Sequence, residues 1–128
     1  MNRTILASGT ILGLVGVVLG ALGAHALKSM LTASALESFR TGVTYQMYHA
    51  LFLLVLGSIN GLDKSLKKPI FYLILTGVLC FSFSIYALTT GPLAGLDFSA
   101  IAWLTPVGGV LLICGWGLML YRVFKSLT

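Results

Sequence analysis

Acidic residues are almost absent from this 128-residue chain, which contains only Glu37, Asp63 and Asp97. Charged residues of both signs make up 9% of the chain and hydrophobic residues 58%, whereas about a quarter of a typical soluble domain is charged. The chain has only two cysteines, Cys80 and Cys114, and we expect them to be small packing residues rather than a disulfide. The composition excludes an ordinary soluble domain and predicts a membrane protein.

Long apolar runs account for most of the chain, at roughly 4–27, 42–60, 69–89 and 100–123. Each is close to the ~20 residues that a helix needs to cross ~30 Å of hydrocarbon. Because unpaired backbone groups are costly in lipid, each run is predicted to be a helix. We therefore predict one domain, residues 1–128, folded as an all-α integral membrane four-helix bundle. Its predicted helices cover about 4–27, 35–60, 69–89 and 99–124.

The net charge of +5 is distributed unevenly between the two predicted sides of the membrane. With four spans, the N-terminus, the second connection and the C-terminus share one side, which carries Arg3, Lys64, Lys67, Lys68, Arg122 and Lys125. The other side carries only Lys28 and Arg40. This bias predicts an inner-membrane protein with both termini in the cytoplasm, and it explains the positive charge through lipid headgroups rather than nucleic acid.

The N-terminus has a second interpretation. Met1-Asn2-Arg3, followed by an apolar run and Ala24-His25-Ala26, is similar to a secretory signal with a cleavage site between small residues. The run is longer than the 7–15 residues of a usual signal core and is rich in glycine. We therefore expect it to remain as the first span.

Glycines in the first apolar run follow one another at intervals of four and three residues: Gly9, Gly13, Gly16, Gly20 and Gly23. This spacing lines one seam of a helix, at the repeat of a left-handed bundle. Glycine lets a neighbouring backbone approach closely, which is a main source of helix association in lipid. We expect close helix packing at this seam and also at Gly108 and Gly109 in the fourth run.

Helix ends and bends are predicted from individual residues. Ser34 is expected to cap the second helix, with Glu37 at the third position of a capping box. Pro69 suits the first turn of the third helix. Pro106 is expected to lie several residues inside the fourth helix and to bend it there.

Polar residues gather in the N-terminal half of the second helix. Plotted at 100° per residue, one sector holds Ser38, Gly42, Tyr45, Gln46 and His49, and the opposite side holds Val43, Met47, Ala50 and Leu54. We expect the first face to point inward and the second toward lipid. The candidate site is a polar cluster in the outer leaflet, because such a face is costly in a membrane unless it has partners. The cluster comprises His25, Glu37, Arg40, Tyr45, Gln46 and His49.

Several motifs together resemble a known family. They are Gly20-Ala21-Leu22-Gly23-Ala24-His25, Phe39-Arg40-Thr41-Gly42-Val43-Thr44-Tyr45-Gln46-Met47-Tyr48-His49-Ala50-Leu51, Phe83-Ser84-Ile85-Tyr86, and Leu104-Thr105-Pro106-Val107-Gly108-Gly109 with Gly115-Trp116. They are similar to the YgdD-like/YwdK-like family of small four-helix bacterial inner-membrane proteins, a domain of unknown function. The chain departs from the family in having Phe83, where glycine is usual, between Ser82 and Ser84. The resemblance implies a fold and a location but no reaction.

The two histidines leave three interpretations open. Each imidazole can bond to a neighbouring side chain or carbonyl and hold helices together, the pair can serve a small transporter or channel, or the pair can bind haem or a metal. Two imidazoles are too few for a closed zinc site. No serine, cysteine or carboxylate pair has a base at recognisable spacing, so we expect no enzyme.

The first interpretation is preferred. It predicts a structural or interaction component of the membrane, without a cofactor, with the bilayer and a homo-oligomer or another membrane protein as partners.

Overall fold

The computed structural model describes residues 1–127, which form four α-helices and three short 3₁₀ segments. The helices are α1 (Asn2–Ala24), α2 (Ala33–Ser58), α3 (Lys64–Thr90) and α4 (Leu104–Ser126). The 3₁₀ segments are η1 (Leu27–Ser29), η2 (Gly91–Ala94) and η3 (Ser99–Ile101). The all-α prediction is confirmed for the described residues.

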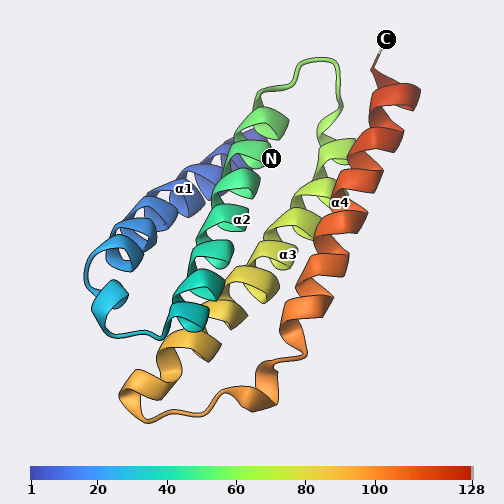
Figure 1. Ribbon diagram of the computed structural model, residues 1–128. Helices are drawn as coiled ribbons and strands as arrows, with labels where there is room; N and C mark the ends of the chain where they lie inside the picture. Colours follow the sequence, from blue (N-terminus) through green and yellow to red (C-terminus); the bar gives the residue numbers. More distant parts are fainter. Residues whose placement is uncertain (128) are drawn as a thin grey trace.

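The helices lie side by side in chain order, as Figure 1 shows. Extensive contacts join α1 to α2, α2 to α3 and α3 to α4, while α1 touches α3 only slightly. Within residues 1–127, α1 and α4 stand at opposite ends of the row, whereas a closed bundle would bring them together. Helix α1 begins and helix α4 ends on the side of the molecule where α2 connects to α3. The middle helices α2 and α3 therefore have helix neighbours on two sides.

All five seam glycines of α1 face α2. A Cβ at Gly9 would lie 2.9 Å from the Ala50 carbonyl oxygen, and one at Gly16 would collide with the Met47 sulfur. A Cβ at Gly23 would be 3.2 Å from the Phe39 ring. The absence of side chains thus lets the α1 backbone lie directly on α2 over the whole length of the seam.

Glycine also sets the crossing of α3 and α4. A Cβ at Gly108 would collide with the backbone nitrogen of Phe81 and would lie 2.8 Å from the Gly77 carbonyl oxygen. Gly77 and Gly115 accept the side chains of Leu112 and Ile74 in the same way. Gly109, next in sequence, has its nearest neighbour at 3.9 Å. Close backbone packing therefore depends on Gly108 and not on Gly109.

Three local predictions about helix ends are wrong. Thr32, not Ser34, caps α2, because its side-chain oxygen accepts the Ala35 N–H at 3.1 Å. Pro69 is the sixth residue of α3, since that helix already begins at Lys64. Pro106 lies in the first turn of α4, which begins at Leu104, so it starts the helix instead of bending it. Both helix starts differ from the prediction because α3 extends beyond the apolar run and the segment before α4 is 3₁₀.

Lys67 is fully buried and joins three helices on the side of the molecule where α2 connects to α3. Its ammonium donates to the Ile59 carbonyl oxygen at 2.7 Å and to Asn2 Oδ1 at 3.1 Å. A cation beside the last carbonyls of α2 is favourable because the C-terminus of a helix carries partial negative charge. The contacts fasten the start of α1 and the end of α2 to the first turn of α3.

The connection between α3 and α4 lies on the opposite side of the molecule, at the other ends of the helices. Gly95 adopts a left-handed conformation with φ of 73°, which favours glycine, and it ends η2. Asp97 Oδ1 then accepts the Ser99 N–H at 2.9 Å and starts η3. This contact lowers the pKa of the Asp97 carboxyl below its ordinary value, because the hydrogen bond favours the charged form. The loop is thus closed by local hydrogen bonds.

Three stretches among the described residues are long and apolar enough to cross a membrane: Asn2–Ala24, Lys64–Ala94 and Ser99–Ser126. The first is α1 alone, the second is α3 with η2, and the third is η3 with α4. Helix α2 has sufficient length at 26 residues but carries the polar cluster in its N-terminal half. The hydrophobic character of the chain thus supports three spans directly, and α2 has to be judged from its packing.

Candidate functional site

The six residues of the predicted polar cluster separate into a buried and a surface group. Gln46 and His49 are buried, with 0% and 3% of their surface exposed. His25, Glu37, Arg40 and Tyr45 are exposed. The structure therefore does not assemble one outer site from all six, and the two groups have different chemistry.

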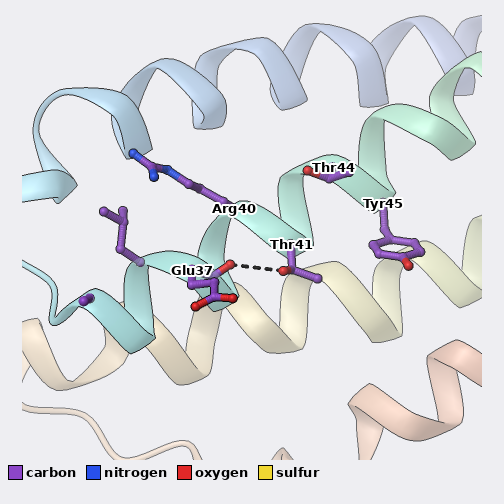
Figure 2. Close-up of a pocket in the computed structure, with 7 residues that line it drawn as sticks. Glu37, Arg40, Thr41, Thr44 and Tyr45 are labelled. Atoms are coloured by element: carbon purple, nitrogen blue, oxygen red, sulfur yellow. Dashed lines mark hydrogen bonds between the residues drawn. The ribbon is translucent and has the colours of Figure 1, made fainter.

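The surface group on α2 lines an open hollow of about 510 Å³, drawn in Figure 2. The Glu37 carboxylate and the Arg40 guanidinium point in different directions from the helix. Thr41 Oγ1 donates to the Glu37 backbone carbonyl at 3.1 Å. Since every lining residue belongs to α2 alone, this hollow is one side of a helix rather than an enclosed site.

The two histidines do not meet. His25 follows α1 and lies among Val18, Leu22 and neighbouring residues on the side of α1 away from the glycine seam. The end of α1 packs at Phe39, and His49 is ten residues further along α2, a distance of about 15 Å at 1.5 Å per residue. The two imidazoles thus lie at different depths and cannot share one ion.

Gln46 links three helices through its amide. Its Nε2 donates to the Leu12 carbonyl oxygen of α1 at 2.8 Å, and its Oε1 accepts the Tyr86 hydroxyl of α3 at 2.6 Å. A carbonyl oxygen can only accept, so the orientation of the amide follows from the chemistry. Tyr86 in turn packs its ring on Phe39 with a centroid distance of 5.1 Å. The amide bonds both neighbours of α2 in the interior of the row.

His49 links α2 to α4. Its Nδ1 lies 2.6 Å from the Tyr45 carbonyl oxygen, and its Nε2 lies 2.9 Å from Nε1 of Trp116. An indole N–H only donates, so Nε2 is the acceptor. Nδ1 therefore carries the imidazole hydrogen and donates it in a hydrogen bond to the Tyr45 carbonyl oxygen. The Trp116 ring also packs on Phe52 with a centroid distance of 4.6 Å.

These contacts define what the His49 imidazole can do. With Nε2 accepting from Trp116 and Nδ1 donating to Tyr45, the ring is neutral and both nitrogens are engaged. A metal or haem iron needs a free nitrogen lone pair, which here would require breaking the bond to Trp116. Among residues 1–127 no group of three histidine, cysteine or carboxylate side chains is placed to hold a metal ion. The arrangement suits helix attachment better than ligation.

Two serines complete the polar contacts between helices. Ser82 Oγ donates to the Gly42 carbonyl oxygen of α2 at 2.7 Å, and Ser84 Oγ lies 2.5 Å from Thr105 Oγ1 of α4. Phe83, between them, is partly exposed and packs edge-on to Tyr86. Its side chain therefore does not enter either serine contact, although glycine is usual at this position in the family that the motifs resemble.

Trp116 and Tyr86 are the partners that sequence reasoning did not assign. Both lie in motifs that carry the resemblance, Gly115-Trp116 and Phe83-Ser84-Ile85-Tyr86. They are 67 and 40 residues away from the side chains they bond, so no local spacing indicates the pairs. The resemblance draws on these two motifs and on the motif that holds Gln46 and His49, and this shared family pattern is the signal that the sequence offers.

The comparison with protein families matches residues 19–109 to the model described as a protein of unknown function, DUF423. The chain belongs to the DUF423 family. The matched region contains Gln46, His49 and Tyr86 and ends before Trp116.

Relatives of this DUF423 protein are membrane proteins by name. The UPF0382 membrane protein of Staphylococcus saprophyticus is 37% identical over 117 residues, which cover 91% of this chain and 93% of the relative. The UPF0382 membrane protein of Haemophilus influenzae is 38% identical over 114 residues, covering 89% and 88%. No solved structure matches the chain. Together with the apolar helices, these names establish a membrane protein.

Replacing His49 by alanine is expected to destabilise this DUF423 protein by about 1–2 kcal/mol, since a partly buried hydrogen bond to Trp116 and the ring contacts are lost. The check is thermal denaturation in detergent, with Trp116 emission recorded in a Trp103→Phe background. Tyr48→Ala is the matched control, because Tyr48 is an exposed aromatic residue on the same helix. Equal melting temperatures for the two variants would show that the His49 contacts do not hold α4.

Proposed function

We propose that this DUF423 protein is an integral four-span protein of the bacterial inner membrane with a structural or interaction role and no enzymatic activity. The observation that supports it is Gln46, which is fully buried and hydrogen-bonded to α1 and α3 at once. A solute pathway needs polar groups that are free to bind the solute. The buried polar groups of α2 instead bond neighbouring helices, which favours a structural role over a transporter or channel.

Helix α2 is proposed as the fourth span because of its neighbours. It packs on α1 along the whole glycine seam, from Leu54 to Phe39, and it contacts α3 on another side. If α1 and α3 cross the bilayer, α2 has to cross beside them. Its inward polar groups are paired, so burying them in hydrocarbon leaves little uncompensated cost. This arrangement supports a transmembrane row of four helices.

The orientation is proposed from charge. The side of the molecule where α1 begins, α2 connects to α3 and α4 ends carries six basic residues: Arg3, Lys64, Lys67, Lys68, Arg122 and Lys125. The opposite side carries only Lys28 and Arg40. Basic residues prefer the cytoplasmic side, so both termini are assigned to the cytoplasm. The family is taken to be the YgdD-like/YwdK-like group of four-helix inner-membrane proteins that the motifs resemble.

The partners proposed are the bilayer and another membrane protein or a second copy. The side of α4 away from α3 exposes large apolar residues such as Val110 and Phe124. An exposed surface of this kind is stable only against lipid or another apolar surface. No soluble or nucleic-acid partner is needed to account for it.

Cysteine labelling tests the topology. In a background with Cys80→Ala and Cys114→Ala, the variants Asn60→Cys and Asp97→Cys are exposed to a membrane-impermeant thiol reagent in intact spheroplasts. We expect labelling at 97 without permeabilisation and at 60 only after it. If α2 instead lies on the outer surface and only three helices span, position 60 becomes accessible from outside and position 97 from inside. That inversion would refute the proposed arrangement of four spans with both termini in the cytoplasm.

A further inference from the structure

A groove runs along the row between α2 and α4, with α3 as its floor. Its outer part has a volume of about 420 Å³ and is lined by Ser38 and Thr41 of α2, Ile85 and Thr89 of α3, and Thr105 of α4. Its deeper part has a volume of about 310 Å³ and is lined by Tyr45 and His49 of α2, Phe81 of α3, and Gly109, Ile113 and Trp116 of α4.

The two parts are successive turns of the same groove. Going inward, each helix advances by four residues: Thr41 to Tyr45 on α2, Ile85 to Phe81 on α3, and Thr105 to Gly109 on α4. From Ser38 to His49 the groove extends about 16 Å at 1.5 Å per residue, roughly half of the ~30 Å hydrocarbon thickness. Its length matches one leaflet of the bilayer.

The inner end of the groove is mostly apolar. Trp116 Nε1 is bonded to His49 across it, and the Trp116 ring lies on Phe52. Because both nitrogens of His49 are engaged, its imidazole is not offered to a ligand. The aromatic rings of Tyr45, Phe81 and Trp116 remain as the surface, which suits a hydrocarbon chain.

The outer end offers hydrogen-bond acceptors but no charge. Thr41 donates its hydroxyl proton to the Glu37 carbonyl, and Thr89 donates to the Ile85 carbonyl, so both oxygens keep lone pairs that accept. Among the described residues that line this outer part, none is ionisable. Glu37 and Arg40 lie on the adjoining side of α2 (Figure 2). A phosphate headgroup needs basic partners, so the groove complements an uncharged head that donates O–H groups.

We propose that this groove binds one uncharged, single-chain amphiphile of the outer leaflet, with a hydroxyl-bearing head at Thr41, Thr89 and Thr105 and its chain against Trp116. The combined dimensions are in the range of small-molecule sites, which are mostly apolar with a few placed polar groups. The proposal rests on the proposed four-span arrangement, because the groove lies in the bilayer only if α2 does.

Trp116 is a built-in reporter for the test, since the only other tryptophan, Trp103, can be removed. The Trp103→Phe protein in nanodiscs is titrated with a monoacylglycerol brominated near the end of its chain. We expect saturable quenching of Trp116, and weaker quenching when the bromine is near the head. Brominated phosphatidylglycerol is the second probe, and it should quench only in proportion to its bulk concentration.

Two glycines of α4 provide matched variants. A Cβ at Gly109 has its nearest neighbour, Phe81, at 3.9 Å, so Gly109→Leu should fill the groove without forcing the helices apart. A Cβ at Gly117 meets nothing within 4 Å, and Gly117 does not line the groove. We expect at least about tenfold weaker monoacylglycerol binding for Gly109→Leu and no change for Gly117→Leu. If Gly109→Leu does not fold, Thr41→Val replaces it, with about fivefold weaker binding expected from one lost hydrogen bond.

Three results would overturn the proposal. Non-saturable quenching that is equal in both glycine variants means contact with bulk lipid only. Equal saturable quenching by phosphatidylglycerol means that the head is not required to be uncharged. Stronger quenching by head-brominated chains means that the ligand is inverted. If cysteine labelling supports four spans and quenching is not saturable, the groove proposal fails alone; inverted labelling instead refutes the proposed topology.

Discussion

Replacing Gly108 by valine is expected to separate α3 from α4 and to destabilise the protein by about 3 kcal/mol, the upper part of the usual range for overpacking. A Cβ at position 108 would collide with the Phe81 nitrogen and would lie 2.8 Å from both Phe81 Cα and the Gly77 carbonyl oxygen. All of these are backbone atoms, so no side-chain rotation relieves the contact. The strain can be relieved only by moving one helix relative to the other.

The measurement is the fraction of protein that remains monodisperse after heating in detergent, followed by size-exclusion chromatography. Trp116 emission is recorded in parallel, because a displaced α4 would break the Trp116 bond to His49. Gly117→Val is the matched control, since it makes the same change in helix propensity at a position with open space. If both variants unfold at the same temperature, the close α3–α4 crossing is not a source of stability.

Gly108 and Gly109 illustrate what a sequence pattern can and cannot indicate. Two adjacent glycines predict close packing somewhere in α4, and the neighbouring backbone of α3 is indeed close. Adjacent residues differ by 100° around a helix, so only one of them can face α3 directly. Which one does so depends on the rotation of α4, and that rotation is set by distant contacts such as Gly77 with Leu112.

The faces of α2 show a second limit. Gly42, Gln46 and His49 are buried as the polar sector predicted, but Val43, Met47, Ala50 and Leu54 do not face lipid. They lie against the glycine seam of α1. A two-sided plot assigns one side to the protein and the other to lipid, whereas a helix inside a row has neighbours on both. Tyr45, expected inside, is 42% exposed and packs its ring against Phe81 of α3.

The helical fold itself was predictable because every backbone N–H and C=O group in lipid needs a hydrogen-bond partner, and few structures other than the helix provide one within each segment. Composition and run length were enough for α1 and for the all-α class. The polar contacts were not predictable in the same way. The sequence places His25 and His49 together near the predicted outer side, yet the partner of His49 is Trp116 of α4. Pairing across 67 residues depends on how helices pack, which local spacing does not encode.

Replacing Gln46 by leucine is expected to destabilise the protein by about 1–3 kcal/mol, although leucine has a similar size and is more soluble in lipid. The substitution removes the bond to the Leu12 carbonyl and leaves the Tyr86 hydroxyl without its acceptor. The Leu12 carbonyl lies inside helix α1 and keeps its backbone hydrogen bond there. We therefore attribute most of the lost stability to the unsatisfied Tyr86 hydroxyl. The measurement is denaturation in mixed micelles with Trp116 emission as the signal.

The double variant Gln46→Leu with Tyr86→Phe separates a lost bond from an unsatisfied hydroxyl. When both polar partners are replaced by apolar groups of similar shape, the change can be nearly neutral, so the double variant is expected to be more stable than Gln46→Leu alone. A coupling energy of about 0.6–1.7 kcal/mol is expected from hydrogen bonds measured within membranes. Strictly additive losses would mean that Gln46 stabilises α1 through Leu12 and not α3 through Tyr86. Since the two bonds use different atoms of one amide, the cycle assigns the energy of Gln46 to one neighbouring helix or the other.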